Sequence, residues 1–444
     1  MRTLACFALV FALLPTAARS QELPPAGEQE ALARLVNEQL RRIEALESRL
    51  AALQQEVKDL RARPGGPVVA AGEPPAAVGV PAPDHENEMV QHAVGGKPPE
   101  DADPEGPNAD LPRAKAIDGY GSLRVAAALD SAANREIRNN SSRLGLRGAK
   151  PLADGIEAFG RVELGVNLVA NDRSILQGGD PGAPIGQGSQ AVFSRLGFVG
   201  IGTGIGSFAW GKQWSAYYDV AEFTDQFPLW SGSANGAFAA DTDGGIAGTG
   251  RAEKALQYRE AKGPLSVALQ MQSRATSPND RTWVDVWAAS AVVGRAQGLS
   301  LGAAYNEVRD GVADPNPNQA QLGDKAAIFG LRYRDDRFYA AGTLSITRQH
   351  EVDDLGRRFD GTGFELALRY LASDRLSLEA GYNDLRPGSD HPGDFRTRFG
   401  VGYVVYSFGA GSRAFAGFKV EGSRNSDGST RAYSAFATGL NYTF

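Results

Sequence analysis

The feature that most constrains this chain is an alternation of apolar and polar residues with a period of two, which runs from Ile117 to the C-terminus. From Leu376 to Asn383, for example, every second residue is apolar, and the residues between are charged, polar or glycine. Successive side chains of a β-strand point to opposite faces, so the pattern predicts strands with one apolar face. Comparable apolar rows, which we expect to face away from the lumen, are Val162, Leu164, Val166 and Leu168; Phe364, Leu366, Leu368 and Tyr370; and Phe399, Val401, Tyr403 and Val405.

Two architectures fit this alternation. A soluble β-sandwich would bury the apolar faces, whereas a membrane β-barrel would turn them toward lipid. Two features favour the barrel: the apolar rows end in aromatic residues, as at a membrane interface, and short turns alternate with longer loops. The short turns are predicted at Lys150–Asp154, Gly202–Gly206, Ala261–Pro264, Gly294–Gly298, Asp335–Asp336, Ser373–Asp374 and Gly409–Gly411, and the longer loops near Asn134, Gly179, Gly232, Pro278, Pro315, Asp353, Pro387 and Asp427.

These connections define the predicted fold. Seven short and eight long connections make 16 strands, with both ends of the barrel on the periplasmic side. Residues 117–444 are therefore predicted to form an all-β, 16-stranded antiparallel transmembrane β-barrel, preceded by a short α-helical coiled coil.

Three segments precede the predicted barrel. Residues 1–20 contain Arg2, a short apolar run and small residues before Gln21, which is the pattern of a secretory signal peptide. The single cysteine, Cys6, lies inside this segment, so the exported protein is expected to lack thiol chemistry. Residues 64–116 are rich in Pro, Ala, Gly and acidic residues and are predicted to be an extended, disordered linker.

Residues 21–63 contain a helical heptad pattern. Two rows of apolar residues recur every seven positions, with Gln39 as the polar interruption, and Arg and Glu flank them; the rows are Val36, Ile43, Leu50 and Val57, and Leu32, Leu46, Leu53 and Leu60. The pattern predicts a short coiled coil and therefore self-association. An amphipathic helix packed against its own barrel is the alternative, and the residues alone do not distinguish two strands from three.

The sequence offers no catalytic or metal-binding arrangement. His85 and His92 lie in the linker at a spacing that suits a metal, but a solvated linker is the simpler explanation. His350 and His391 lie at predicted loops, away from an activated serine on a strand end. We therefore expect no enzyme activity and no cofactor. The formal net charge of −6, without a basic tail or domain, gives no indication of nucleic-acid binding.

One connection is much longer than the others. Between the strands that end near Lys212 and begin near Ala255 lie about forty residues rich in Gly, Ala, Ser and Asp. Loops of this length inside a compact domain are uncommon and usually functional. If the flanking segments are barrel strands, this loop is long enough to fold inward and narrow the lumen.

A series of short motifs follows in order along the predicted barrel. They are Asn140–Gly148, Phe193–Phe198, Gly206–Lys212, Tyr218–Asp219, Phe223–Pro228, Gly250–Arg251 and Asn441–Phe444. In order and spacing these motifs resemble the general diffusion porins of Gram-negative outer membranes. The resemblance covers residues 117–444 and implies a trimer, an inward-folded constriction loop and a C-terminal row that serves as an outer-membrane assembly signal. That row is Phe436, Leu440, Tyr442 and Phe444.

The candidate constriction residues combine parity with this resemblance. Three arginines, Arg143, Arg195 and Arg251, have the opposite parity to their apolar neighbours and are predicted to face the lumen. The resemblance places them at the basic constriction cluster of the family, and Asp225 at one of its two loop acids. Leu229 occupies the place of the other acid. Asp241 and Asp243 are candidates to restore the missing acid, although they match no position of the family.

Further arginines of inward parity predict a basic track along the lumen. They are Arg332, Arg334, Arg369, Arg375, Arg396, Arg398 and Arg413. Fixed arginines facing loop carboxylates would create a field across a narrow pore, which sorts solutes by charge and polarity. A bland alternative is that these arginines are solvated lumen residues without a role in selectivity.

The sequence thus predicts an outer-membrane porin for passive diffusion of small hydrophilic solutes and ions, with a weak preference for anions. Its expected partners are two further copies of the chain, outer-membrane lipid and lipopolysaccharide. One alternative is a solute-selective porin for anionic nutrients such as dicarboxylates, because porins that take up dicarboxylates also resemble this chain in carrying a coiled coil before the barrel. Another is a tether whose N-terminal segment contacts the cell wall while the barrel anchors it.

Overall fold

The computed structural model describes residues 117–169, 192–238, 243–273, 283–294, 297–309, 324–409 and 411–444. The predicted signal peptide, coiled coil and linker, together with Asp241, lie outside the described residues. Among the described residues, no helix is long and apolar enough to cross a membrane.

The described residues form strands and one short helix. The elements are β1 (Asp118–Asp130), β2 (Arg135–Asn139), β3 (Arg143–Ala153), β4 (Ile156–Val166), β5 (Val192–Thr203), β6 (Gly206–Trp214), α4 (Tyr218–Ala221), β7 (Arg251–Lys262), β8 (Leu265–Gln272), β9 (Val286–Gly294), β10 (Gly298–Val308), β11 (Lys325–Arg334), β12 (Phe338–Val352), β13 (Arg358–Ser373), β14 (Leu376–Pro387), β15 (Thr397–Gly409), β16 (Ser412–Glu421) and β17 (Ala435–Thr443).

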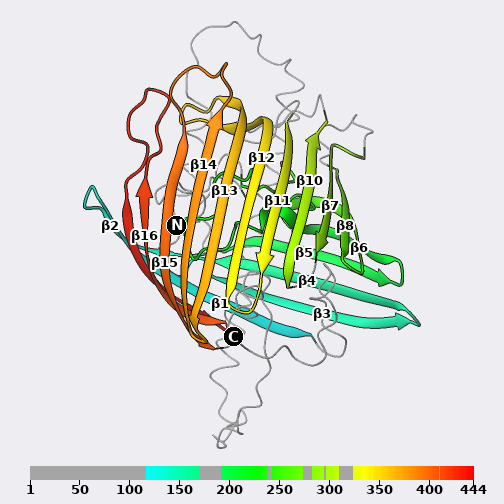
Figure 1. Ribbon diagram of the computed structural model, residues 1–444. Helices are drawn as coiled ribbons and strands as arrows, with labels where there is room; N and C mark the ends of the chain where they lie inside the picture. The colour runs from blue at the N-terminus through cyan, green and yellow to red at the C-terminus, as the bar shows by residue number, and fades with distance from the viewer. Residues whose placement is uncertain are drawn as a thin grey trace, which may run out of the picture. The chain divides into compact units, whose positions relative to one another are not determined.

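The strands form one antiparallel sheet that closes on itself. Each strand pairs with its neighbour along the chain, and β1 also pairs with β17, with Ser122 opposite Thr443. Because β1 pairs with both β2 and β3, these two segments act as one strand with a break at residues 140–142. The described residues therefore make a closed barrel of 16 strands, which confirms the predicted 16-stranded antiparallel barrel; Figure 1 shows β10 to β16 as neighbouring strands of its wall.

The two faces of the wall follow the predicted alternation on most strands. On β14, Leu378 is exposed on the outside while Glu379 is buried inside. On β4, Val162 and Leu164 are exposed and Glu163 is buried. The outward row formed by Phe436, Leu440 and Tyr442 of β17 and by Phe444, which follows the strand, is about half exposed, as a lipid-facing surface requires.

The prediction for β15 was wrong. Phe399, Val401, Tyr403 and Val405 face inward and are almost completely buried. The outward row of this strand instead contains Val404, Tyr406 and Phe408, all of which are exposed. Both faces of β15 are apolar because its inner face packs against residues of the long loop, including Leu229 and Trp230. Alternation alone does not assign the faces of a strand that has two apolar sides.

Candidate functional site

The long loop between β6 and β7 begins at Ser215, includes α4 and ends at Gly250. Its described residues, 215–238 and 243–250, lie inside the barrel. The helix packs against β9, β10 and β11, and Val220 and Ala221 on it are completely buried. Further along, the loop reaches inward-facing residues of β12, β13, β14 and β15. The loop thus follows one side of the barrel wall from within.

A single carboxylate on the wall holds two parts of this loop. Glu365 of β13 accepts hydrogen bonds from the Thr224 hydroxyl at 2.6 Å and the Ala234 backbone N–H at 2.7 Å. The side-chain amide of Asn235 donates a third at 3.0 Å. Carboxylate acceptors make strong hydrogen bonds in a water-poor setting, so Glu365 ties Thr224 and the turn at Ala234 to the same point of the wall.

Three further side chains of the wall bind carbonyl oxygens of the loop. The Tyr339 hydroxyl donates to Phe223 O at 2.7 Å, and the Tyr403 hydroxyl donates to Leu229 O at 2.5 Å. His350 Nε2 lies 2.7 Å from Gly236 O, while its Nδ1 lies 2.6 Å from Asp324 Oδ1. These contacts satisfy loop carbonyls that would otherwise be buried without partners.

Small residues on the wall allow this close approach. A Cβ atom built on Gly363 of β13 would lie 1.7 Å from Ala234 O, so no other residue type fits there without displacing the loop. A Cβ atom on Gly330 of β11 would lie 2.8 Å from side-chain atoms of both Val220 and Phe223. The glycines therefore form the surface on which the loop rests.

Arg143, Arg195 and Arg251 all face inward, and each is only 1% exposed. Arg195 lies at an irregularity in the pairing of β4 with β5, and its Nε donates to Glu163 Oε1 at 2.7 Å. Arg161 donates to the other carboxylate oxygen of Glu163 at 2.8 Å. Arg143 pairs with Gly165, two residues from Glu163 on the same face of β4. Several guanidinium groups therefore surround one carboxylate, which leaves this part of the wall positive.

The sequence before Arg143 explains its position. Asn140 donates a side-chain hydrogen bond to Pro228 O of the loop at 3.0 Å. Ser142 Oγ accepts a hydrogen bond from the Arg124 backbone N–H at 2.8 Å and donates one to Arg124 O at 3.0 Å. These two bonds replace the backbone hydrogen bonds between strands that are missing at the break between β2 and β3. The motif thus contacts the loop and restarts the strand with Arg143 facing inward.

Arg251 occupies the point where the loop returns to the wall at β7. Its guanidinium lies 4.9 Å from the ring centre of Trp214 and 5.9 Å from that of Phe238. Its backbone N–H donates to Asp243 O at 2.8 Å. Lys212 Nζ donates to Asp243 Oδ2 at 2.7 Å. Burial raises the pKa of Asp243, but Lys212 and Arg251 outweigh this and hold that pKa below its ordinary value. Asp243 is therefore an ionised member of this cluster.

The loop presents further carboxylates. Asp225 is half-buried and accepts a hydrogen bond from the Tyr218 hydroxyl at 2.7 Å. Asp219 binds Arg259 through both carboxylate oxygens, at 2.7 and 2.8 Å, and also accepts from Ser290. Glu222 is half-buried on the same stretch. The sequence did not single out the wall residues Glu163 and Glu365, because alternation does not show what an inward acid on a strand faces. It did not single out Glu222 because this loop residue lies outside the strand alternation.

Leu229 does not occupy a lumen-facing position. Its side chain is 2% exposed and packs in an apolar cluster with Phe399, Val401 and Tyr403. The residue that replaces the family's second acid therefore contacts the wall. A carboxylate at this position would therefore be buried against the wall and would not face the lumen.

We expect Leu229→Glu to lower the thermal stability of the folded protein and to have little direct effect on ion selectivity. Burying a carboxylate in this cluster costs several kcal/mol, on the order of 3 or more, unless the group becomes protonated. Leu229→Met, which keeps the volume and the apolar character, is the control and should cost less than about 1.5 kcal/mol. Circular dichroism during heating measures the loss of β-structure. A Leu229→Glu protein with unchanged stability and stronger cation selectivity would show that this side chain reaches the lumen.

The predicted basic track is only partly supported. Arg332, Arg334, Arg369 and Arg413 lie on inward faces. The prediction was wrong for three others: Arg375 is exposed in the turn before β14, and Arg396 and Arg398 lie on the outward face of the wall. Parity failed at Arg375 because this residue lies in the turn between β13 and β14. It failed on β15 because the apolar row that was predicted to face outward faces inward, so the arginines of the other row face outward.

Comparison with known proteins supports the architecture. The family described as Gram-negative porin matches residues 114–444. Outer membrane porin F of Xenorhabdus nematophila is 24% identical over 361 residues, which is 74% of this chain and 92% of that protein.

Two solved structures share the fold. Salmonella typhi OmpF has a TM-score of 0.59 and 17% identity, over 74% of this chain and 97% of that one. The anion-selective porin from Comamonas acidovorans has a TM-score of 0.54 and 14% identity, over 74% of this chain and 99% of that one. With a family match over most of its length and a closed barrel that contains an inward loop, the chain belongs to the Gram-negative porins of the outer membrane.

Proposed function

We propose that this porin forms a water-filled diffusion channel narrowed between the inward loop and the arginine-bearing wall, and that it prefers anions weakly. The observation that carries the proposal is the placement of the two sides. The loop packs against β9 to β11 through α4 and is hydrogen-bonded to β12 to β15, whereas Arg143 and Arg195 lie on β3 and β5, and Arg251 lies where the loop returns to β7. In the order of the closed sheet, β5 and β13 are half a circumference apart. Solutes must pass between these sides.

The charges on the two sides support a transverse field. Arg143, Arg161 and Arg195 surround Glu163 on the wall, while Asp219, Glu222 and Asp225 lie on the loop. Arginine keeps its charge at every physiological pH. Because charges more than about 8–10 Å apart are largely screened at physiological salt, we propose that the excess of guanidinium groups on the wall, where three surround the single carboxylate of Glu163, decides selectivity rather than the net charge of the barrel. The preference for anions should therefore be strongest in dilute salt.

The expected assembly is a homotrimer, in line with the family, in contact with outer-membrane lipid and lipopolysaccharide. Small hydrophilic solutes and ions are the proposed cargo. A selective channel for anionic nutrients such as dicarboxylates is the second candidate, and the inward Arg332, Arg334 and Arg369 favour it. A cell-wall contact through residues 21–63 stays a prediction.

One experiment tests the proposal. Purified protein is inserted into planar bilayers, and single-channel conductance is recorded together with the reversal potential in a salt gradient. Open steps with a small anion-favouring reversal potential that grows in dilute salt are expected. A clearly cation-selective pore would contradict the assignment of the basic wall, and the absence of any conductance would favour a tether. Saturation of the current by one class of carboxylate would favour the selective channel.

Glu222 gives the channel a pH dependence. Burial raises the pKa of this carboxyl to about 7, although Arg332 and Arg334 oppose the shift. Below that pH the group takes up a proton, so the loop loses one negative charge. Lowering the pH from about 8 to about 6 should therefore increase the anion preference, with its midpoint near the pKa.

The reversal potential at fixed salt gradient measures this change. Glu222→Gln removes the titrating group but keeps its size, so it should fix selectivity near the acid value across the same pH range. If the Glu222→Gln pore titrates as the wild type does, another group is responsible.

A further inference from the structure

His350 differs from the other side chains that hold the inward loop, because its contact with the loop depends on its own charge. The side chain is buried, with Nδ1 2.6 Å from Asp324 Oδ1 and Nε2 2.7 Å from Gly236 O. A carbonyl oxygen and an ionised carboxylate accept hydrogen bonds and cannot donate them. Both ring nitrogens must therefore carry a proton, which makes the ring a positively charged imidazolium.

The charged groups of the wall favour this state. Arg358, at the start of β13, has its Nη1 3.8 Å from Asp324 Oδ2, which favours the ionised form of Asp324. The same Nη1 donates to His350 O at 3.4 Å. Glu351 follows His350 in β12 and is also buried. Two carboxylates and one guanidinium therefore lie around the ring, and the excess of negative charge stabilises the imidazolium.

The loop side of the contact is closely fitted. Gly236 has a φ of 77°, and a Cβ atom there would lie 2.9 Å from the Tyr217 hydroxyl oxygen and 3.7 Å from His350 Cδ2. Tyr217 and Glu365 are the titratable groups on this side, and both bind the preceding residue. The Tyr217 hydroxyl donates to Asn235 O at 2.8 Å, and the Asn235 amide donates to Glu365 at 3.0 Å. His350 thus holds the loop one residue beyond this attachment.

We propose that His350 is a positioning residue whose protonation controls the inward loop. The loop stays against the wall while the ring carries two protons, and it is released at this point when the ring loses one in alkaline solution. The inference rests on the proposed diffusion channel, which this loop narrows.

The geometry determines which contact is lost. A neutral ring keeps one proton, and this proton stays on Nδ1, because a lone pair that faces the Asp324 carboxylate is less favourable than one that faces a carbonyl. Nε2 then presents its lone pair to Gly236 O, and two acceptors repel each other. The contact is therefore complete in acidic and neutral solution and is lost as the pH rises.

The test is single-channel recording of the full-length protein in planar bilayers, from about pH 8 to about pH 10.5. Burial raises the pKa of Glu222 to about 7, so this loop carboxyl is already mostly ionised where the series begins. Partial closures should become about tenfold more frequent as the pH rises, because a buried contact to a charged donor is lost. The change should reverse when the pH is lowered again.

Two variants separate protonation from simple packing. The side-chain amide of His350→Gln has a donor close to the position of Nε2 and does not titrate, so its closure frequency should stay within about twofold over the series. Asp324→Asn removes the charge that stabilises the imidazolium. Its alkaline rise in closures should therefore occur about one pH unit or more below that of the wild type.

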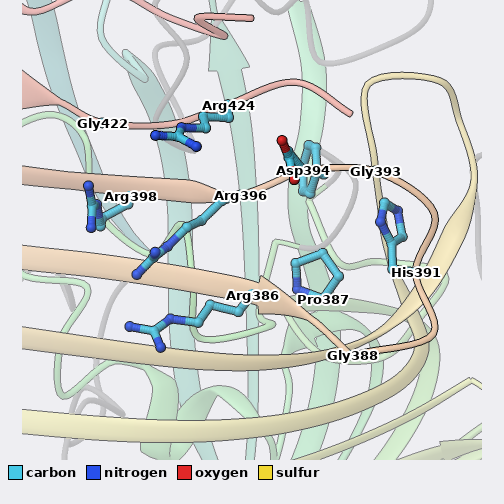
Figure 2. A pocket seen from close by; sticks show the side chains of 11 residues that line it. Arg386, Pro387, Gly388, His391, Gly393, Asp394, Arg396, Arg398, Gly422 and Arg424 are labelled. Atoms are coloured by element: carbon cyan, nitrogen blue, oxygen red, sulfur yellow. The ribbon is translucent and has the colours of Figure 1, made fainter. Parts of the chain in front are cut away.

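His391→Gln is the matched control, because it makes the same change at the other described histidine. Figure 2 shows His391 in the loop between β14 and β15, where it lines a pocket together with Arg398 and Arg424 on the outward face of the wall. Its Nε2 lies 3.1 Å from Asp353 Oδ2, and its Nδ1 has no hydrogen-bond partner among the described residues. One proton satisfies this ring, so His391→Gln should titrate as the wild type does.

Three results would overturn the inference: a wild-type channel that is equally quiet at every pH, an alkaline rise that persists in His350→Gln, or an Asp324→Asn rise at an unchanged pH. A rise that persists in His350→Gln would belong to another group, such as Lys212 beside Asp243. In all three cases open channels are still recorded, so the channel proposal stands. The absence of conductance at every pH would instead overturn the channel proposal, and this inference with it.

Discussion

A porin carrying Glu365→Leu is expected to show a noisy open channel with frequent partial closures. The substitution removes the acceptor of three hydrogen bonds, from Thr224, Ala234 and Asn235, and so frees two parts of the loop at once. Each buried donor left without a partner costs about 1–3 kcal/mol. Lumen water would satisfy some of these donors when the loop moves away from β13, so the loop should leave its position on the wall.

Single-channel recording measures the effect as open-channel noise and closure frequency. Glu365→Gln is the matched control because it keeps the shape and one oxygen acceptor, and we expect it to lie between the wild type and Glu365→Leu. A quiet channel of wild-type conductance in Glu365→Leu would show that the tyrosines and His350 hold the loop without this carboxylate.

Replacing Arg143, Arg195 and Arg251 together by glutamine should change the sign of the reversal potential, from a weak anion preference to a cation preference. The triple variant removes three positive charges from the wall, while the loop acids and Glu163 remain. Glu163 keeps hydrogen bonds from Arg161 and the Tyr120 hydroxyl, both at 2.8 Å, so it is not left as an unpaired buried charge. The barrel should therefore still fold.

The reversal potential in a salt gradient at low ionic strength gives the result, because screening weakens the effect in concentrated salt. A variant that loses Arg375, Arg398 and Arg424 instead is the control: it loses the same charge at positions away from the lumen. If both triple variants change selectivity equally, the total charge of the barrel decides selectivity and the assigned constriction has no special role.

Much of the wall could be predicted from the sequence because its physical rule is local. Adjacent residues of a strand face opposite media, so Glu365 and Arg369 could be assigned to the inside from their neighbours alone. The rule failed on β15, where Tyr403 faces the loop and Tyr406 faces lipid, so that both rows are apolar. The alternation of residues does not show whether a given row of the strand faces lipid, the lumen or the inward loop.

For the loop, only its existence and its inward path could be predicted from the sequence. Its attachments connect Thr224 with Glu365, which are 141 residues apart, and Leu229 with Tyr403, which are 174 apart. No local period links such pairs. Leu229 illustrates the consequence: the sequence showed that an acid was missing there, but only the fold shows that the side chain packs against the wall.

The pairing of β1 with β17 also sets the order in which this protein acquires its shape. Ser122 and Thr443, whose hydroxyl oxygens lie 3.2 Å apart, are separated by 321 residues. Until the last strand of the chain is available, β1 and β16 each present an unpaired edge, which in a lipid bilayer has no water to bind it. Contacts between residues so distant in sequence form slowly. A cell that makes this protein must therefore hold an almost complete chain in an unclosed state, and truncation near the C-terminus would leave it there permanently.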